Sequence, residues 1–285
     1  TGAGRGITNV YGGAVTNEKN AAGTVTGNSV MLKNGRTSKV YGGYTRGKGA
    51  VGGSADGEGN AVTLENGVAG DVYGGAIDNS DSTAAVTGNK VTIQNGTYNR
   101  LYGGHTKGKG AAQNNEVTIS GGTSSDDVHG GYTHDGGAAT GNKVTLTGGV
   151  VDGVVYGGYT NGSGKTTGNT VNLGDGEHNL AAGTNIAGTV FGGNKADVTD
   201  NTLNINTNAQ AGNIKNFDHL KFNLNSHALT QSTPVLRLNS GATGNLDWRK
   251  LDVNAEKFNA PIKTYEAYNL VLMENANGIS FQQGA

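Results

Sequence analysis

The chain has 285 residues, of which 52 are glycine and none is cysteine, and its formal net charge is −1. A chain of this length can bury a core without disulfides. A near-neutral charge without a basic stripe excludes a nucleic-acid partner. No apolar run reaches the ~18 residues of a membrane span, and the pattern of the first residues does not predict a signal peptide.

The chain is repetitive over most of its length. The word Val-Tyr-Gly-Gly, or a close variant, recurs at steps of 30, 32, 29, 27, 27 and 35 residues. Self-similarity at such a period is typical of a solenoid, a propeller or another modular array. The copies begin at Val10, Val40, Val72, Leu101, Val128, Val155 and Val190.

A second word, Gly-Asn-x-Val-x-Leu, lies between successive copies of the first. Its asparagine and two aliphatic residues share one face, because side chains alternate along a strand. We expect the aliphatic residues to stack inward and the asparagine amides to bond one another at an inner corner, as in a parallel β-helix. The predicted ladder consists of Asn28, Asn60, Asn89, Asn115, Asn142, Asn169 and Asn201.

Two connections join the words, and only one of them is regular. The connection after Val-x-Leu has 7 or 8 residues in the first five repeats and contains Asn-Gly or Gly-Gly, which adopt positive φ at little cost. The connection after Val-Tyr-Gly-Gly varies from 6 to 15 residues. Variable loops on one side of a regular stack usually carry the binding function of repeat proteins.

Two architectures fit these words. Each repeat is either one coil of a parallel β-helix, or an antiparallel hairpin in which the Asn-Gly turn folds Val-x-Leu back on Val-Tyr-Gly. Stacked hairpins would form a β-roll, prism or propeller. The sevenfold stack with uneven loops favours the all-β parallel β-helix.

Two aromatic positions also repeat. The second position of Val-Tyr-Gly-Gly is Tyr11, Tyr41, Tyr73, Tyr102, His129, Tyr156 or Phe191 in the successive copies. Because the row tolerates His129, we expect semi-exposed stacked rings that pack between coils. A second row follows Gly-Gly at the start of the variable loops, where rings could contact a sugar or a protein. Its candidate binding residues are Tyr44, His105, Tyr132 and Tyr159.

One stretch imitates a nucleotide-binding loop. The run from Gly158 to Thr166 includes Gly164-Lys165-Thr166, but Tyr159 stands where the motif needs its first glycine. A strand-like segment follows instead of the helix that would face the phosphates. We interpret the stretch as a repeat corner, and no cofactor is predicted.

Catalytic and metal sites are not predicted either. His129, His134 and Asp135 are close in sequence, but a zinc site needs three or four ligands with a second shell of partners. The acids of the regular connection form no consistent column that could line a sugar-cleaving cleft. These acids are Asp71, Asp126, Asp127 and Asp152. The chain is therefore expected not to be an enzyme.

The last quarter has a different composition. Glycine becomes rarer from about residue 211, and four of the five phenylalanines and the single tryptophan, Trp248, lie here. Alternating segments predict strands at 220–224, 235–238, 251–253 and 268–272. We divide the chain into solenoid repeats at 1–210 and a β-rich capping segment at 211–285 that continues the solenoid. Such a cap would cover the open end, where exposed strand edges aggregate.

The two words, followed by "AGNIKNFDHLKFNL" and "TPVLRLNSGATGNLDW", resemble the passenger region of large bacterial autotransporters and the segment that closes its repeats. The resemblance implies a right-handed parallel β-helix and export across the outer membrane to the cell surface. It also implies adhesion or self-association, and contact with the membrane only through a barrel downstream of Ala285.

Three functional hypotheses follow. The first is an adhesin that binds a host surface protein or glycan, or a copy of itself on a neighbouring cell, through loops on one edge. The second is a passive stalk that presents another module. The third is a carbohydrate-active β-helix enzyme, which the lack of a carboxylate cleft disfavours.

Overall fold

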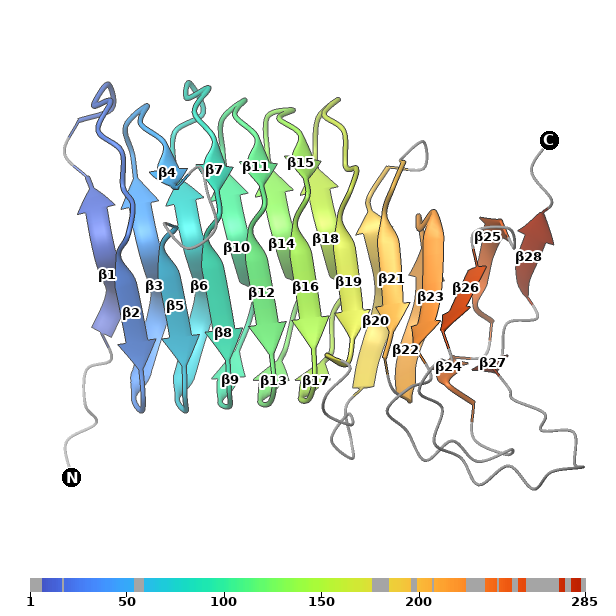
Figure 1. Cartoon of the computed structure of the whole chain (residues 1–285). Coiled ribbons are helices and arrows are strands. Elements are labelled where there is room, and N and C mark those ends of the chain that lie inside the picture. The colour runs from blue at the N-terminus through green and yellow to red at the C-terminus, as the bar shows by residue number, and fades with distance from the viewer. Residues whose placement is uncertain are drawn as a thin grey trace, which may run out of the picture.

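The computed structural model of the chain is all-β (Figure 1), and every element in its described part is a strand. The described residues are 7–16, 18–53, 59–175, 185–195, 199–206, 208–223, 234–239, 241–247, 251–254, 272–274 and 278–282.

The strands form four sheets. The first sheet has 13 strands: β1 (Ile7–Val15), β3 (Arg36–Thr45), β6 (Val68–Ile77), β9 (Thr97–Tyr98), β10 (Leu101–Thr106), β13 (Thr123–Ser124), β14 (Val128–Thr133), β17 (Val150–Val151), β18 (Val155–Thr160), β20 (Asn185–Gly193), β22 (Ala209–Lys215), β24 (Leu236–Leu238) and β27 (Met273–Glu274). The second sheet has nine: β2 (Ser29–Leu32), β5 (Ala61–Leu64), β8 (Lys90–Ile93), β12 (Glu116–Ile119), β16 (Lys143–Leu146), β19 (Thr170–Leu173), β21 (Thr202–Ile205), β23 (His219–Asn223) and β26 (Leu251–Asn254).

The other two sheets are small. The third sheet has four short strands: β4 (Val51–Gly52), β7 (Val86–Thr87), β11 (Ala112–Gln113) and β15 (Ala139–Thr140). The last sheet pairs β25 (Thr243–Asp247) with β28 (Gly278–Gln282).

The chain winds as a right-handed parallel β-helix of about seven turns, which confirms the predicted fold. We number the coils 1 to 7 by their copies of Val-Tyr-Gly-Gly. All pairings between described strands are parallel, and each word pairs with the same word of the next coil: Val40 with Val72, and Val117 with Val144. The alternative of stacked antiparallel hairpins is therefore wrong, because Val-x-Leu never folds back on Val-Tyr-Gly in the described coils.

The Asn-Gly and Gly-Gly words form the corners between the second and first sheets. Their second residues all have positive φ, which a side chain would make costly. These residues are Gly35, Gly67, Gly96, Gly122 and Gly149, with φ between 82° and 144°. The same requirement explains why the turn that suggested hairpins serves equally well as a β-helix corner.

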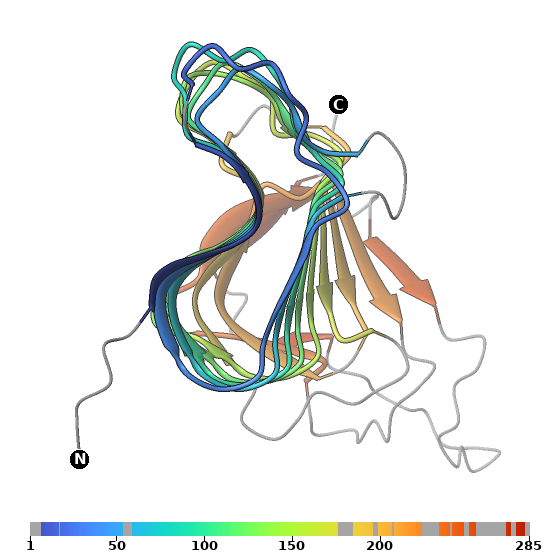
Figure 2. The same cartoon turned by 90° about the vertical axis from the view of Figure 1, so that its left-hand side faces the viewer.

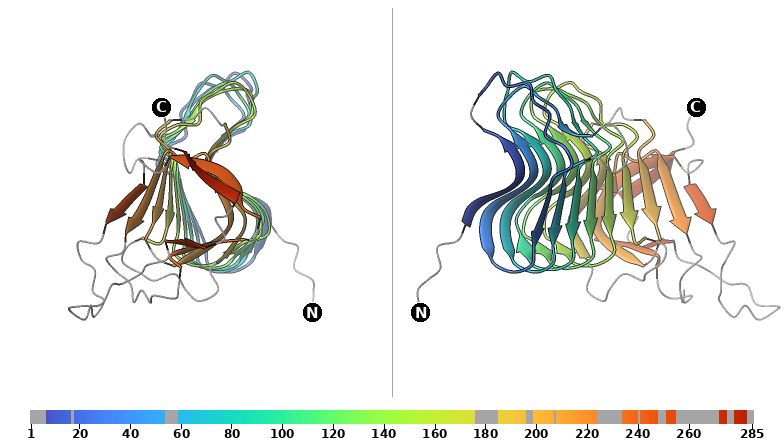
Figure 3. Two further views of the ribbon diagram at one scale, coloured as in Figure 1. Left: turned by 90° about the vertical axis from the view of Figure 1, so that its right-hand side faces the viewer. Right: turned by 60° about the vertical axis from the view of Figure 1, so that its left-hand side comes forward.

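The coil outline has two compartments, which Figure 2 shows in a view along the stack. The larger is enclosed by the first and second sheets and is filled by the aliphatic residues of the two repeat words. The smaller is lined by the third sheet and contains Val25, Val51, Ile77 and Val86. Strands of the first sheet bend as they pass from the large to the small compartment (Figures 2 and 3).

The asparagine ladder runs along the boundary between the two compartments. Each amide Nδ2 donates to the Oδ1 of the next asparagine at 2.9–3.2 Å, from Asn28 through to Asn201. The same Oδ1 also accepts the backbone N–H of the preceding ladder residue, and Nδ2 donates its second proton to a carbonyl of the small compartment. From Asn60 to Asn201 the side chains are fully buried. The amides thus satisfy backbone groups that would otherwise be buried without partners.

The Gly-Gly pair is required because the first glycine lies against the next coil and the second against the opposite leg. A Cβ on Gly103 would lie 2.5 Å from the Gly130 carbonyl oxygen of the next coil, and one on Gly104 would lie 2.4 Å from the amide of Asn115 on the opposite leg. Both distances are shorter than any van der Waals contact. Every coil with a complete ladder therefore needs two consecutive residues without side chains.

The solenoid continues past the predicted boundary at residue 210. Strand β22 spans it and pairs with β20 and β24 in the first sheet. Phe217 and Phe222 are buried in the main core, whereas Trp248 and residues 255–271 lie outside the described residues. Asp218 Oδ2 accepts the backbone N–H of Asn201 at 3.2 Å, in the place of a next asparagine. A carboxylate has no amide proton to pass on, so the ladder ends there.

Replacing Asn142 with Leu should destabilise the protein by about 3 kcal/mol. The substitution removes the acceptor of the Asn115 backbone N–H and of one Asn115 amide proton, and the donor to the Ala112 carbonyl and to Asn169 Oδ1, all in a buried place. Urea unfolding followed by circular dichroism measures the loss. Asn161→Ala, on an exposed loop, is the control and should cost less than about 0.5 kcal/mol. Equal midpoints for the two variants would show that the ladder does not stabilise the fold.

Candidate binding edge

An unbroken stack of seven rings runs along the outer side of the bent strands. Neighbouring rings lie 4.7–5.1 Å apart with interplanar angles of 6–14°, close to the spacing of the coils. The members are Tyr11, Tyr41, Tyr73, Tyr102, His129, Tyr156 and Phe191. We call this the inner row. The inner row lies outside the core, because the residue immediately before each ring, such as Val40 before Tyr41, points inward.

The prediction of a semi-exposed inner row is wrong for its middle members. Tyr41, Tyr73, Tyr102 and His129 are only 4–7% exposed. The rings of the second aromatic row cover them edge-on: His129 and Tyr132 have centroids 5.2 Å apart at 88°. Burial also raises the pKa of the Tyr156 phenol to about 12.

The second row, which we call the outer row, lies within strands rather than on projecting loops. Tyr44 is the penultimate residue of β3, and His105, Tyr132 and Tyr159 occupy the same position in β10, β14 and β18. Three of its rings stack on one another, with centroids 5.0–5.1 Å apart and planes within 8°. Their faces are therefore occupied by each other, and a partner would meet ring edges and hydroxyl groups instead.

Tyr44 is not available as a surface contact. It is 7% exposed, it has Ala14 and Ala76 beside it in place of rings, and its hydroxyl reaches Asp78 Oδ2 at 2.9 Å. Ala76, only 2% exposed, is covered as well. Of the four candidate binding residues, His105, Tyr132 and Tyr159 are thus half-buried, and Tyr44 is a packing residue.

The loops that follow the outer row in coils 2, 4 and 6 share one turn. A buried threonine accepts a backbone N–H from the glycine two residues later: Thr45 from Gly47 at 2.9 Å, Thr106 from Gly108 at 3.0 Å, and Thr160 from Gly162 at 3.2 Å. The residue between them is exposed and is Arg46, Lys107 or Asn161. In coil 5 the exposed His134 also follows a buried threonine, but the Thr133 hydroxyl donates to the Gly137 carbonyl instead. We call the outer row and these tips together the loop edge.

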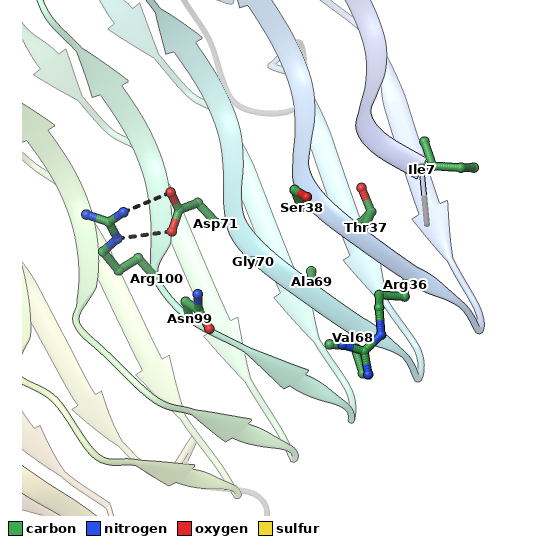
Figure 4. Close-up of a pocket in the computed structure, with 10 residues that line it drawn as sticks. All are labelled: Ile7, Arg36, Thr37, Ser38, Val68, Ala69, Gly70, Asp71, Asn99 and Arg100. Carbon is green, nitrogen blue, oxygen red and sulfur yellow. Dashed lines mark hydrogen bonds and ion pairs between the residues drawn. The ribbon is translucent and has the colours of Figure 1, made fainter. Parts of the chain in front are cut away.

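Sequence reasoning missed a cleft of about 560 Å³ on the first sheet, shown in Figure 4. The small residues Ser38 and Gly70 line it, and at one end Asp71 pairs with Arg100. Arg100 Nε and Nη2 each lie 3.0 Å from an oxygen of Asp71, whose second oxygen also accepts from the Tyr73 hydroxyl at 3.3 Å. The Asp71 hydrogen bonds raise the pKa of the Arg100 guanidinium further. Both groups are thus held as a charged pair.

The cleft of Figure 4 lacks the pair of carboxylates that a glycoside hydrolase uses. Asp71 is the single carboxylate that lines the cleft of Figure 4, and both of its oxygens are occupied. A glycosidase needs two carboxylates on opposite sides of the bond that it cleaves. Within the described ranges, no group of three or more His, Cys, Asp or Glu side chains could hold a metal ion.

Comparison with family models, with curated proteins and with solved structures finds no match for this chain. In the described part of the chain there is also no helix long and apolar enough to cross a membrane.

The stretch from Gly158 to Thr166 comprises the end of β18 and the first part of the turn that leads to β19, and no helix follows it. Its glycines allow neighbouring coils to approach closely, since a Cβ on Gly164 would lie 2.1 Å from the Gly137 carbonyl oxygen. Lys165 is exposed beside a cleft of about 320 Å³ that also includes Lys195.

Lys165→Ala should change the free energy of unfolding by less than about 0.5 kcal/mol, because the side chain is an exposed loop residue. MgATP should not raise the melting temperature of either protein, as measured by differential scanning fluorimetry. A rise with the wild type that disappears with Lys165→Ala would overturn the assignment of this stretch as a repeat corner.

Protonation of His129 should make the fold acid-sensitive. Burial, followed by the His105 and Arg100 charges, lowers the pKa of His129 to about 3. Its unfolded pKa is ~6.5. The stability due to neutral His129 is therefore complete above about pH 6.5 and is lost as the pH falls towards 3. The loss is up to ~1.4 kcal/mol per pH unit.

The variant His129→Tyr, which installs the residue found in five other coils, should remove this part of the pH dependence. Denaturant unfolding from pH 7 to pH 4.5 measures it, with His134→Gln as an exposed control that leaves the slope unchanged. Identical slopes for wild type and His129→Tyr would mean that His129 is protonated within the folded state.

Proposed function

We propose that the chain is the adhesive part of a bacterial surface protein of the autotransporter type, and that it binds through the loop edge without catalysis. The observation that carries the proposal is the loop edge itself. In coils 2, 4 and 6 the same buried threonine and the same turn present a different exposed side chain, and in coil 5 the buried Thr133 precedes the exposed His134. A rigid frame that varies at one edge is suited to recognition.

The partner is a host surface protein or glycan, or a second copy on a neighbouring cell. Because the ring faces of the outer row stack on each other, the contacts are made by ring edges, hydroxyls and loop tips. The Tyr132 hydroxyl is already positioned by Asn161 Nδ2 at 3.0 Å. Adjacent coils repeat such contacts every ~4.8 Å, and linked weak contacts add up to a high avidity.

The passive stalk is the competing function. It would use the ladder and the core in the same way but would gain nothing from differences between the tips. The two functions therefore differ in what happens when the tips are made uniform.

The test uses beads coated with the purified full chain, and it counts attachment to cultured cells and to other beads. Tyr132→Ser/Tyr159→Ser and, separately, the exposed pair His134→Ser/Asn161→Ser should each reduce attachment at least about fivefold, since repeated contacts are lost together. The control Thr92→Ser/Thr118→Ser, on the outer side of the second sheet, should have no effect. Melting curves verify folding. Undiminished attachment by both folded loop-edge variants would favour the stalk.

A further inference from the structure

A second cleft, of about 440 Å³, lies among the loops of coils 1 to 4. Its lining is polar and includes Lys19, Arg46, Asp78, Asn79 and Lys107. We propose that this cleft binds a sugar unit that carries an oxyanion, sulfate or carboxylate, within an acidic polysaccharide. The inference rests on the adhesive function proposed above and names the class of its ligand.

Asn79 makes the cleft rigid. The side chain is 3% exposed, and its Nδ2 lies 2.9–3.1 Å from the carbonyl oxygens of Lys19, Arg46 and Gly47. Its Oδ1 accepts the backbone N–H of Asp81 at 3.0 Å. One amide thus clamps the loops of coils 1, 2 and 3, so little conformational entropy remains to be lost when a ligand binds.

The charges that line the cleft leave a positive excess. Three cations, Lys19, Arg46 and Lys107, line the cleft. Asp78 pairs with Lys107, and Asp81 beside the cleft pairs with Lys19, which leaves a net charge of +1. Both carboxylate oxygens of Asp78 have partners: Lys107 Nζ pairs with Oδ1, and the Tyr44 hydroxyl donates a hydrogen bond to Oδ2. Although burial favours its neutral form, these two hydrogen bonds lower the pKa of Asp78. Asp78 therefore stays ionised and orients Lys107.

Two basic tips of the same pattern border the cleft. Coil 2 has Thr45-Arg46-Gly47-Lys48-Gly49, and coil 4 has Thr106-Lys107-Gly108-Lys109-Gly110. They flank the acidic tip of coil 3, where Lys19 lies 2.7 Å from Asp81. The hydrogen bond from Lys19, and then the charges of Lys48 and Lys109, lower the pKa of Asp81. Arg46 forms no ion pair with any described residue. Its planar guanidinium is free to bind two oxygens of an anion.

A sugar fits this cleft better than an acidic peptide. No large apolar side chain lines it to anchor a peptide residue, and the lining instead offers the hydroxyl of Ser80 with the amide and cations. The two basic tips are two coils apart, about 10 Å along the stack. A linear polymer with regularly spaced charges can therefore bridge them.

The experiment measures binding of the purified full chain to immobilised heparin, desulfated heparin, hyaluronan and neutral dextran. Heparin should bind with an affinity that falls as salt rises, and dextran should not bind. Binding to desulfated heparin and hyaluronan as tight as to heparin assigns the carboxylate, and binding to heparin alone assigns the sulfate.

Arg46→Gln/Lys48→Gln should weaken binding about tenfold, while Lys33→Gln/Lys221→Gln, an equal loss of exposed charge elsewhere, should stay within about twofold. Equal losses in the two variants, or no binding to any charged polymer, would overturn the proposal. So would a poly-glutamate peptide that binds as tightly as heparin and is equally sensitive to Arg46→Gln/Lys48→Gln. Beads that still attach to cells without binding any acidic polymer would refute this inference and leave the adhesive function standing.

Discussion

The fold depends on one constraint: two legs of each coil approach so closely that buried amides must replace ordinary side-chain packing between them. The asparagine ladder satisfies the backbone groups at this boundary, and the Gly-Gly pair leaves room for it. Neither can exist alone, because a Cβ at Gly131 would overlap the amide of Asn142, with a closest approach of 2.5 Å. The joint recurrence of the two words in the sequence is the consequence.

This boundary also determines where the aromatic residues go. The side of each glycine that would carry a Cβ faces the inside of this boundary. The residues before and after the pair, such as Tyr102 and His105, therefore both point outward. Their rings meet at 5.0 Å and 74°. The S-shaped bend thus converts a strand motif into two ring rows that pack edge to face, which stabilises the bend from outside. The aromatic rows are a structural consequence of the ladder before they are a binding surface.

The periodicity of the sequence was enough to predict the strand register and the ladder, because each column is repeated seven times. It could not reveal the second compartment. Val25 and Val86 each lie three residues before a ladder asparagine, but Val51 lies nine residues before Asn60, so the column has no constant spacing in the sequence. Nor could it place Tyr44 in the interior, since that depends on Ala76 being small and on Asp78 accepting its hydroxyl. The charge cluster around Asn79 joins four coils, so no single repeat contains its signal.

The loops can vary because the ladder and the buried threonines separate their chemistry from the stability of the fold. Arg46 and Lys48 are exposed, whereas Gly47 between them is buried against the Ala21 carbonyl. A substitution at an exposed tip position changes charge without disturbing a core contact, while one at the intervening glycine would push two coils apart. The charge and shape of each tip can therefore change through its alternate residues. The spacing between tips stays fixed by the ~4.8 Å step of the parallel sheets, so any extended partner meets the same geometry whichever side chains the tips present.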